Sequence, residues 1–224
     1  MNSPPDIIPN NPLFAQLPQR TLEDLTASAI QRTYRAREII VYQGDVWPNL
    51  FLVAAGEIHA VKESLEGRTL IATTLEPGDI FWGLAFFIPE ASMPVMLQAN
   101  SPAVIHIWTR DMLVPIIQEF GSMSWHLCQV MIQRMQLASE IVEELAFHPV
   151  MSRLAGFLLD ISGKTEDEYI ARDFTLDEMA ARIGTTREMV CRHLYRFAEK
   201  GAIDINRTEF KITNRGYLEN QAMR

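Results

Sequence analysis

The sequence predicts an α+β fold in three consecutive parts, and three observations support this prediction. From Tyr34 to Trp108, short β-prone runs alternate with turn residues, which is typical of an antiparallel β-barrel or jelly roll. From Pro115 to Phe147, apolar residues recur in steps of three and four, which predicts one long helix. After His148-Pro149, a helix expected at Val150–Ser162 and two short amphipathic segments precede a second pair of β-prone runs. The expected parts are a double-stranded β-helix (jelly roll) at residues 1–109, a long helix at 110–147 and a winged helix-turn-helix at 148–224.

The first part begins without strand signals. Residues 1–12 are rich in Pro and Asn and predict a loose arm, whereas Leu13–Arg32 predicts one or two short helices. The buried residues expected in these helices are Leu17, Leu22, Leu25 and Ile30. The runs expected to form strands are Glu38–Tyr42, Leu50–Ala54, Ile58–Val61, Leu70–Thr74, Val95–Gln98 and Ala103–Trp108. The turn signals between them are Gly44-Asp45, Ala55-Gly56-Glu57, Gly67-Arg68 and Pro77-Gly78-Asp79.

The long helix carries two apolar rows. One row contains Met123, Leu127, Val130, Leu137 and Ile141, and the other contains Met131, Met135, Ala138, Val142 and Leu145. Because steps of three and four residues also characterise a coiled-coil seam, we interpret one row as facing the β-domain and the other as facing a second copy of the chain. The alternative is a single helix buried in one core, with Glu140, Glu143 and Glu144 on a solvated flank.

The stretch from Phe174 to Leu194 predicts two short helices packed against each other. Thr175 followed by Glu178 has the spacing of a capping box at the start of the first helix. Ala180 is small enough for close helix contact, and Gly184 supplies the tight turn between the helices. The arrangement is typical of a helix-turn-helix.

The second of these helices carries the predicted DNA-reading surface. Thr185 or Thr186 can cap its start. Its inner apolar face carries Met189, Val190 and Leu194. Arg187, Glu188 and Arg192 then point away from that face, near the end of the helix that enters a DNA groove. The alternative is a helical hairpin that only packs, with its charges solvated.

The hairpin that follows is similar to the wing of a winged helix. Its strands are expected at Ala202–Ile205 and Phe210–Ile212, with a turn near Arg207. Arg207 and Lys211 could contact a phosphate backbone there, where they would position the protein rather than specify a sequence. Cys191 lies beside the base-reading residues, either as a small residue tolerated near DNA or as a thiol whose oxidation would repel phosphate.

Charge is distributed unevenly along the chain. The net charge is −8 over 224 residues, which argues against indiscriminate coating of nucleic acid. Residues 1–148 contain 8 basic and 16 acidic residues, whereas residues 149–224 contain 12 of each. Within 179–215 the balance is +4. A basic patch on an acidic protein favours specific binding to double-stranded DNA.

Composition narrows the classes of protein to which this chain can belong. No apolar run approaches the ~20 residues of a membrane span, and the N-terminus lacks the pattern of a signal peptide. Cys128 and Cys191 lie in separate regions and predict no disulfide framework. We therefore expect a cytoplasmic protein with no membrane contact. His59 and His106 have no His-x-His spacing, and the chain has no nucleophile elbow, so we expect neither a metal site, nor catalytic residues, nor an enzyme.

A β-roll, a long helix and a C-terminal winged helix, in this order, resemble the CRP/FNR superfamily of bacterial transcription regulators. The resemblance extends from about Leu13 to Tyr217, and its most specific parts are the glycine turns, Arg134–Glu140 and Thr186–Arg192. It implies a homodimer that regulates transcription and contacts RNA polymerase. The acidic loop Glu166-Asp167-Glu168 is a weak candidate for that contact, because charge runs are usually only solvated.

The resemblance also implies a DNA target. In the cyclic-AMP receptor branch, residues matching Arg187, Glu188 and Arg192 read a half-site resembling TGTGA. The hydrogen-bonding groups of these side chains agree with such a half-site, because Arg donates to guanine O6 and N7 and Glu accepts from cytosine N4. His193 departs from the pattern, since the family prefers an aliphatic residue there. We expect a symmetric dimer that reads a palindrome with TGTGA-like half-sites.

The effector site departs further from the family. Cyclic-nucleotide-binding relatives carry Gly-Glu for the ribose and then Arg-Ser or Arg-Thr for the phosphate. Here no Glu follows Gly83, Met93-Pro94 stands at the Arg position, and no cation lies between Phe81 and Val95. The base-contacting Thr-Ser pair becomes Ala138-Ser139. Because burying a phosphate without a cationic partner is costly, the sequence argues against cyclic AMP.

Other effectors are judged from the residues present. No cysteine precedes Cys128, which excludes the iron–sulfur cluster of the oxygen-sensing branch. A haem-based gas sensor is an alternative, with His59, His106 and His126 as ligand candidates. The residues that could enclose an apolar effector, or simply fill the roll, are Trp82, Phe86, Phe87, Met93, Met96, Met131 and Met135. The cofactor is therefore unknown at this stage, and a regulator with an empty β-roll is a further alternative.

Overall fold

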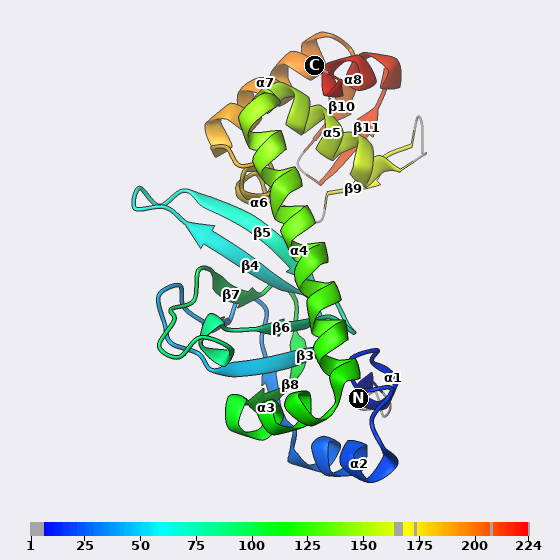
Figure 1. Cartoon of the computed structure of the whole chain (residues 1–224). Coiled ribbons are helices and arrows are strands. Elements are labelled where there is room, and N and C mark those ends of the chain that lie inside the picture. Colours follow the sequence, from blue (N-terminus) through cyan, green and yellow to red (C-terminus); the bar gives the residue numbers. More distant parts are fainter. Residues whose placement is uncertain (1–6, 164–167, 173, 207, 224) are drawn as a thin grey trace. The chain divides into compact units, whose positions relative to one another are not determined.

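The computed structural model describes residues 7–163, 168–172, 174–206 and 208–223 (Figure 1). The chain forms two compact units. The first contains residues 1–63 and 72–137, and the second contains residues 64–71 and 138–224. Among the described residues, no helix is both long and apolar enough to cross a membrane.

Two four-stranded antiparallel sheets form the β-roll. One has the order β1-β8-β3-β6, with β1 at Ile30–Tyr34, β8 at Ala103–Thr109, β3 at Asn49–Ala55 and β6 at Ile80–Trp82. The other has the order β2-β7-β4-β5, with β2 at Ile39–Val41, β7 at Met96–Ala99, β4 at Ile58–Glu63 and β5 at Thr69–Leu75. The six predicted strand runs are confirmed within one or two residues at each end.

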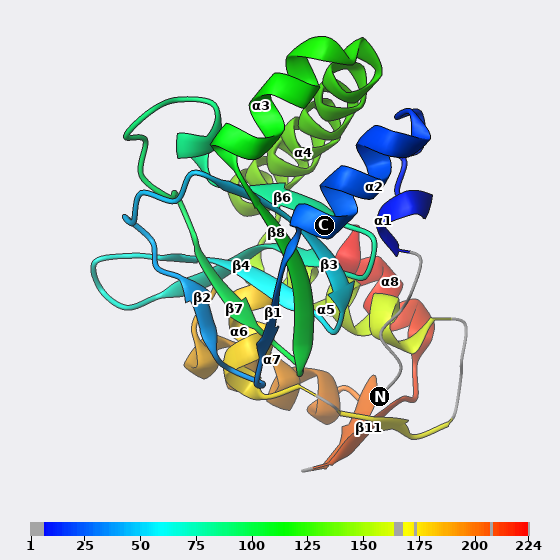
Figure 2. The same ribbon diagram turned by 90° about the horizontal axis from the view of Figure 1, so that it is seen from below.

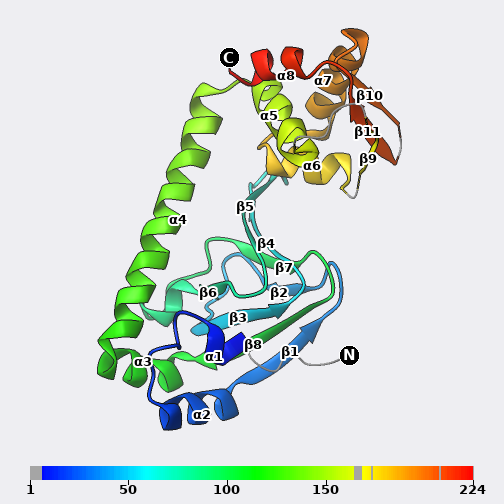
Figure 3. The ribbon, with the colours of Figure 1, turned by 90° about the vertical axis from the view of Figure 1, so that its right-hand side faces the viewer.

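The alternation of β3 separates two apolar cores. Leu50 and Leu52 pack with the helices α1 (Ile7–Asn10), α2 (Gln19–Ser28), α3 (Arg110–Glu119) and the start of α4. Phe51 and Val53 point the other way, into the core between the two sheets. Successive strand residues face opposite sides, so one strand serves both cores. Figure 3 shows α1, α2 and α3 gathered beside the sheet that contains β1, β8 and β3, and Figure 2 shows this arrangement from another side.

The predicted long helix is two helices. The first, α3, begins at Arg110 rather than Pro115, because Thr109 is extended and ends β8. Phe120 is also extended, with φ −107° and ψ 98°, and α4 then runs from Gly121 to Phe147. The Ser124 hydroxyl donates to the Ile117 carbonyl at 2.9 Å, which satisfies a carbonyl at the end of α3.

Other sequence expectations for the first unit are corrected by the structure. Ile7–Asn10 of the expected loose arm forms α1, and Ile8 is buried in the core below it. The expected helical segment ends at Ser28, and Ile30–Tyr34 pairs with β8 instead. Ile30 is therefore 41% exposed, while Leu17 and Leu25 are buried as expected. The short strand β6 was not anticipated.

The second unit is a helical domain with a small sheet. It contains α5 (Val150–Ser162), α6 (Leu176–Arg182), α7 (Arg187–Glu199) and α8 (Arg215–Ala222). Its antiparallel sheet has the order β10-β11-β9, with β10 at Ile203–Ile205, β11 at Glu209–Ile212 and β9 at Ile170–Ala171. The sequence predicted α5, the two helices and the hairpin, but neither β9 nor α8. Its core contains apolar residues from all of these helices.

Candidate nucleic-acid interface

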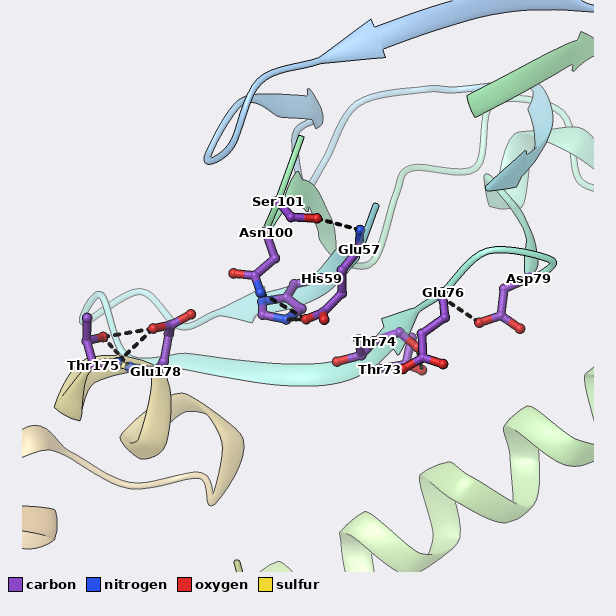
Figure 4. Close-up of polar contacts among 10 residues, drawn as sticks. All are labelled: Glu57, His59, Thr73, Thr74, Glu76, Asp79, Asn100, Ser101, Thr175 and Glu178. Carbon is purple, nitrogen blue, oxygen red and sulfur yellow. Dashed lines mark hydrogen bonds and ion pairs between the residues drawn. The ribbon is translucent and has the colours of Figure 1, made fainter. Parts of the chain in front are cut away.

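The first helix of the interface, α6, starts with the capping box that the sequence predicts. The Glu178 backbone N–H donates to Thr175 Oγ1 at 3.1 Å, and the Thr175 N–H donates to Glu178 Oε2 at 2.8 Å (Figure 4). Two backbone donors at the helix start are thereby satisfied. The buried Met179 and Ala180 then hold α6 in the core of the second unit.

The turn between α6 and α7 depends on Gly184. Its φ is +62°, in the left-handed region that other residues avoid, and the Thr185 N–H donates to the Ala180 carbonyl at 2.9 Å. A Cβ at this position would lie 2.4 Å from Leu145 Cδ2. The cap of α7 is Thr186, whose Oγ1 accepts from the Met189 N–H at 3.4 Å, so the alternative cap, Thr185, is not used.

The recognition helix α7 has one buried and one exposed side. Val190, Leu194 and Phe197 belong to the core of the second unit. Arg187, Glu188 and Arg192 are exposed, and Cys191 is half-buried beside them. The structure therefore places the three predicted base-reading residues on the solvent side of one helix.

Two exposed ion pairs hold these side chains. Arg187 Nη1 lies 3.2 Å from Asp177 Oδ2 on α6, and Arg192 Nη2 lies 2.9 Å from Glu188 Oε1 one turn earlier. The Arg187 and Arg192 side chains are 63% and 53% exposed. Because exposed ion pairs of this kind contribute at most about 1 kcal/mol, a nucleic-acid ligand can replace them at little cost.

A fourth residue on this face was missed by the sequence analysis. Tyr195 follows Arg192 by three residues and is 75% exposed. Positions 188, 192 and 195 follow the three-and-four spacing of one helix face. The sequence alone shows this spacing, and the signal that could have identified Tyr195 is an aromatic residue on an otherwise charged helix face.

The wing is arranged around an exposed tyrosine. Lys211 on β11 places its Nζ 5.8 Å from the ring centre of Tyr169, and the Tyr169 hydroxyl donates to Asp204 Oδ2 at 2.6 Å. This hydrogen bond is the largest cause of the raised pKa of Tyr169. Lys211 is thus on the hairpin as predicted, whereas Arg207, together with Glu166 and Asp167, lies outside the described residues.

His193 occupies the buried side of α7. It is 7% exposed, and within the described part of the chain its Nδ1 has no hydrogen-bond partner. Burial lowers the pKa of His193, and the nearby charges of Arg196 and Arg192 lower it further. The residue that departs from the family pattern is therefore a neutral imidazole on the buried side of the recognition helix itself.

In the first unit the predicted effector cluster comes together only in its aromatic part, where the ring centre of Phe87 lies 4.9 Å from that of Phe86 and 5.8 Å from that of Trp82. Phe86 is buried with the helices and Trp82 packs against that core, while Met93 is buried between the sheets. Phe87 is 41% exposed. Met96 is half-buried, and Met131 and Met135 are 52% and 68% exposed on α4.

The histidines considered as haem ligands are also dispersed. His59 Nε2 lies 2.7 Å from Glu57 Oε1, and the same oxygen accepts from Asn100 Nδ2 at 2.9 Å (Figure 4). His106 packs near Trp108, and burial lowers its pKa. Among the described residues, no group of three or more His, Cys, Asp or Glu side chains could hold a metal ion.

The fold and the exposed face of α7 define a β-roll protein with a C-terminal DNA-binding helix-turn-helix. The cyclic nucleotide-binding domain family matches residues 31–120, and the Crp-like helix-turn-helix domain family matches residues 152–221. The chain belongs to the CRP/FNR family of DNA-binding transcription regulators.

Known proteins resemble the chain over most of its length. It is 27% identical over 191 residues to the cAMP-activated global transcriptional regulator Vfr of Pseudomonas aeruginosa, covering 82% of this chain and 89% of Vfr. It is 26% identical over 212 residues to the cyclic AMP receptor protein of Thermus thermophilus, covering 93% and 95% of the two chains. A CRP/FNR-family regulator from Eubacterium rectale shares the fold, with a TM-score of 0.78, 20% identity and coverage of 95% and 98%.

The turn between α6 and α7 gives a stability prediction. We expect Gly184→Ala to lower the free energy of unfolding of the second unit by about 1–2 kcal/mol, because alanine is strained at positive φ. Gly156→Ala is the matched control, since a Cβ there meets nothing within 4 Å and alanine is favoured inside helix α5. Urea unfolding followed by circular dichroism measures both. A Gly184→Ala protein as stable as the Gly156→Ala protein would contradict the role of the turn.

His193 gives a pH prediction. In the unfolded chain it binds a proton near pH 6.5, but in the folded state its lowered pKa keeps it neutral until the pH is lower. Its contribution to stability is therefore present above pH 6.5 and is lost as the pH falls below that value, by at most about 1.4 kcal/mol per pH unit. We expect His193→Gln to lose less stability than the wild type between pH 7.5 and pH 5.5 in urea unfolding, and equal losses would reject this assignment.

Proposed function

We propose that the chain acts as a homodimer that reads a palindrome with TGTGA-like half-sites and regulates transcription in response to an effector other than cyclic AMP. One observation carries the DNA part of the proposal. Arg187, Glu188 and Arg192 project from the solvent side of α7, where exposed ion pairs hold them. These side chains are therefore free to exchange their protein partners for base edges.

The chemistry of these side chains matches the bases of the proposed half-site. Each guanidinium can donate two parallel hydrogen bonds to guanine O6 and N7, and the Glu188 carboxylate can accept from cytosine N4. Arg187 lies in the first turn of α7, at the end that docks into the major groove in helix-turn-helix proteins. In this proposal Lys211 on the wing and Tyr195 at the far end of the exposed face of α7 contact the phosphate backbone of DNA, where contacts position the protein.

The dimer is supported by an unpartnered apolar face on α4. The exposed side chains on this helix include Trp125, Ile132, Met135 and Val142, which are 69%, 53%, 68% and 64% exposed. Their spacings of seven, three and seven residues repeat as a coiled-coil seam does. Met123 and Leu127 on the opposite side are buried in the core of the first unit. A second copy of α4 would bury the exposed face.

The names of Vfr and of the Thermus thermophilus relative include cyclic AMP, whereas the effector proposed for this chain is a different molecule. Met93, at the position of the phosphate-binding Arg in cyclic-nucleotide-binding relatives, is 2% exposed within the core between the sheets. A Cβ at Gly83 would lie 1.9 Å from the Trp47 carbonyl oxygen, so the close backbone approach here requires glycine. A cyclic phosphate at this position would displace the apolar contacts of Met93, and the methionine side chain offers it no charge.

RNA polymerase is the expected protein partner. Glu168 is the described residue of the acidic loop, and it is exposed. The haem alternative gains no support from His59, since its Nε2 already pairs with Glu57. A regulator without an effector would leave the roll as a purely structural domain.

DNA reading is tested by substitution on α7. We expect Arg187→Ala to reduce discrimination at one base pair of each half-site by about 5-fold to 150-fold, which corresponds to about 1–3 kcal/mol. Arg196→Ala removes the same charge from the same helix and is expected to weaken binding to all sequences alike. Selection from a randomised half-site measures both variants. An unchanged base preference in Arg187→Ala would refute the role of Arg187.

Dimerisation is tested on α4. We expect Met135→Glu to convert the dimer into a monomer, because two buried carboxylates would face each other across the seam. Gln136→Glu adds the same charge at the neighbouring exposed position and should leave the dimer intact. Sedimentation equilibrium gives the mass of each. A wild-type protein that sediments as a monomer, or a dimeric Met135→Glu variant, would contradict the seam.

A further inference from the structure

One arginine of the second unit joins helix α5, the end of helix α4 and the α6–α7 turn. Arg153 lies in the first turn of α5. Its Nη1 donates to three carbonyls at the end of α4 and just after it, those of Glu144 at 3.2 Å, Leu145 at 3.4 Å and His148 at 3.0 Å. Its Nη2 donates to the Gly184 carbonyl at 3.3 Å. All of these residues belong to the second unit.

The sequence explains why the end of α4 needs a donor from outside the helix. In a continuing helix the Leu145 carbonyl would accept from the N–H four residues later, but that residue is Pro149, which has no N–H. The Nη1 of Arg153 donates to this carbonyl instead. Its positive charge also lies at the negative end of the α4 dipole, where cations are favourable. Arg153 is therefore a cap for α4 that a different helix supplies.

The guanidinium is carried by a fixed piece of backbone. Leu154 and Ala155, which follow Arg153 in α5, are buried in the core of the second unit. Burial lowers the pKa of Arg153, and the charge of Glu144 opposes this shift. Arginine keeps its proton in proteins, so the group offers all of its donors.

The α6–α7 turn also touches the end of α4 through a side chain. A Cβ added at Gly184 would lie 2.4 Å from Leu145 Cδ2, so the backbone of the turn already lies against this leucine. Arg153 bonds to the carbonyls of the same two residues. Because Gly184 comes shortly before the start of α7, these contacts fix where α7 begins relative to α4.

We propose that Arg153 is a positioning residue for DNA binding, which holds the recognition helix α7 in a fixed orientation relative to the end of α4. The inference rests on the dimer proposed above, because Val142 at the same end of α4 belongs to the proposed dimer face. If each α7 is fixed relative to this shared face, the two recognition helices are held at a fixed separation. Dimers of this kind read half-sites about one turn of DNA, ~34 Å, apart. Arg153 thus contributes to the choice of half-site spacing.

Half-site spacing is the readout that separates positioning from general stability. The wild type and Arg153→Gln are titrated with duplexes that carry one or two copies of the half-site selected by the wild type, with the two copies about one DNA turn apart or a few base pairs nearer or farther. The preference for the best spacing should fall about threefold or more in Arg153→Gln, because a less rigidly held α7 adapts to more spacings. Affinity for one half-site should change less than about twofold, since α7 still reads the bases.

Two matched variants accompany this test. Arg153→Lys keeps the charge, but its single ammonium lacks the two NH₂ groups that serve α4 and Gly184. Its spacing preference should therefore lie between those of the wild type and Arg153→Gln. Arg182→Gln removes an exposed cation of α6 and should keep the wild-type preference. If Arg153→Gln loses its fold by circular dichroism, Arg153→Lys decides the question, and a wild-type preference in that variant would overturn the proposal.

The contact itself is tested without DNA by NMR, because the chemical shift of a carbonyl carbon reports its hydrogen bonding. The carbonyl signals of Leu145 and Gly184 should both move in Arg153→Gln and stay in place in Arg182→Gln.

Three results would overturn the proposal: Arg153→Gln keeps the wild-type spacing preference, it loses affinity for one half-site as strongly as for the palindrome, or the two carbonyl signals do not move. A wild type that sediments as a monomer or selects no half-site would reject the proposed function and, with it, the role of Arg153 in DNA binding. A dimer that binds its half-site specifically but whose spacing preference is unaffected by Arg153→Gln would reject the role of Arg153 alone.

Discussion

The burial of one side of α7 is the constraint on which the DNA-facing surface depends. Val190, Leu194 and Phe197 belong to the core of the second unit, and a helix of 3.6 residues per turn must then present its other side to solvent. The caps of α6 and α7 and the left-handed Gly184 determine where the helix begins. Arg187 and Arg192 therefore project from a rigid support, which lowers the entropy that each would lose on binding a base.

Helix α4 also has one buried side and one exposed side, but its exposed side is apolar. Met123 and Leu127 are buried in the first core, yet Trp125 and Met135 on another side are largely exposed. Apolar surface in water is unfavourable by about 25 cal/mol per Å², so an apolar row repeated over several turns is typical of a helix with a partner. One helix thus carries part of the packing of the β-roll and the proposed seam.

The β-roll shows that a fold can be kept while its chemistry changes. Met93 contributes to the core between the sheets, and Arg134 on α4 is a half-buried cation over the rings of Phe81 and Trp82. Function therefore has to be argued from the site rather than from the fold.

Local sequence determined the elements whose signals are short-range: the strand runs with their glycine turns, helix α5, the Thr175–Glu178 capping box and the outward side of α7. The edge strand β1 was missed because its residues are mostly polar and exposed, so that pairing with β8, far along the chain, makes it a strand. Hydropathy predicted that Phe86 and Met93 are apolar fillers or pocket residues, but not that they enter different cores. A pocket in the first unit joins residues near positions 11, 75 and 130, and only tertiary structure decides such contacts, because they depend on how distant segments pack and not on the preference of any one segment.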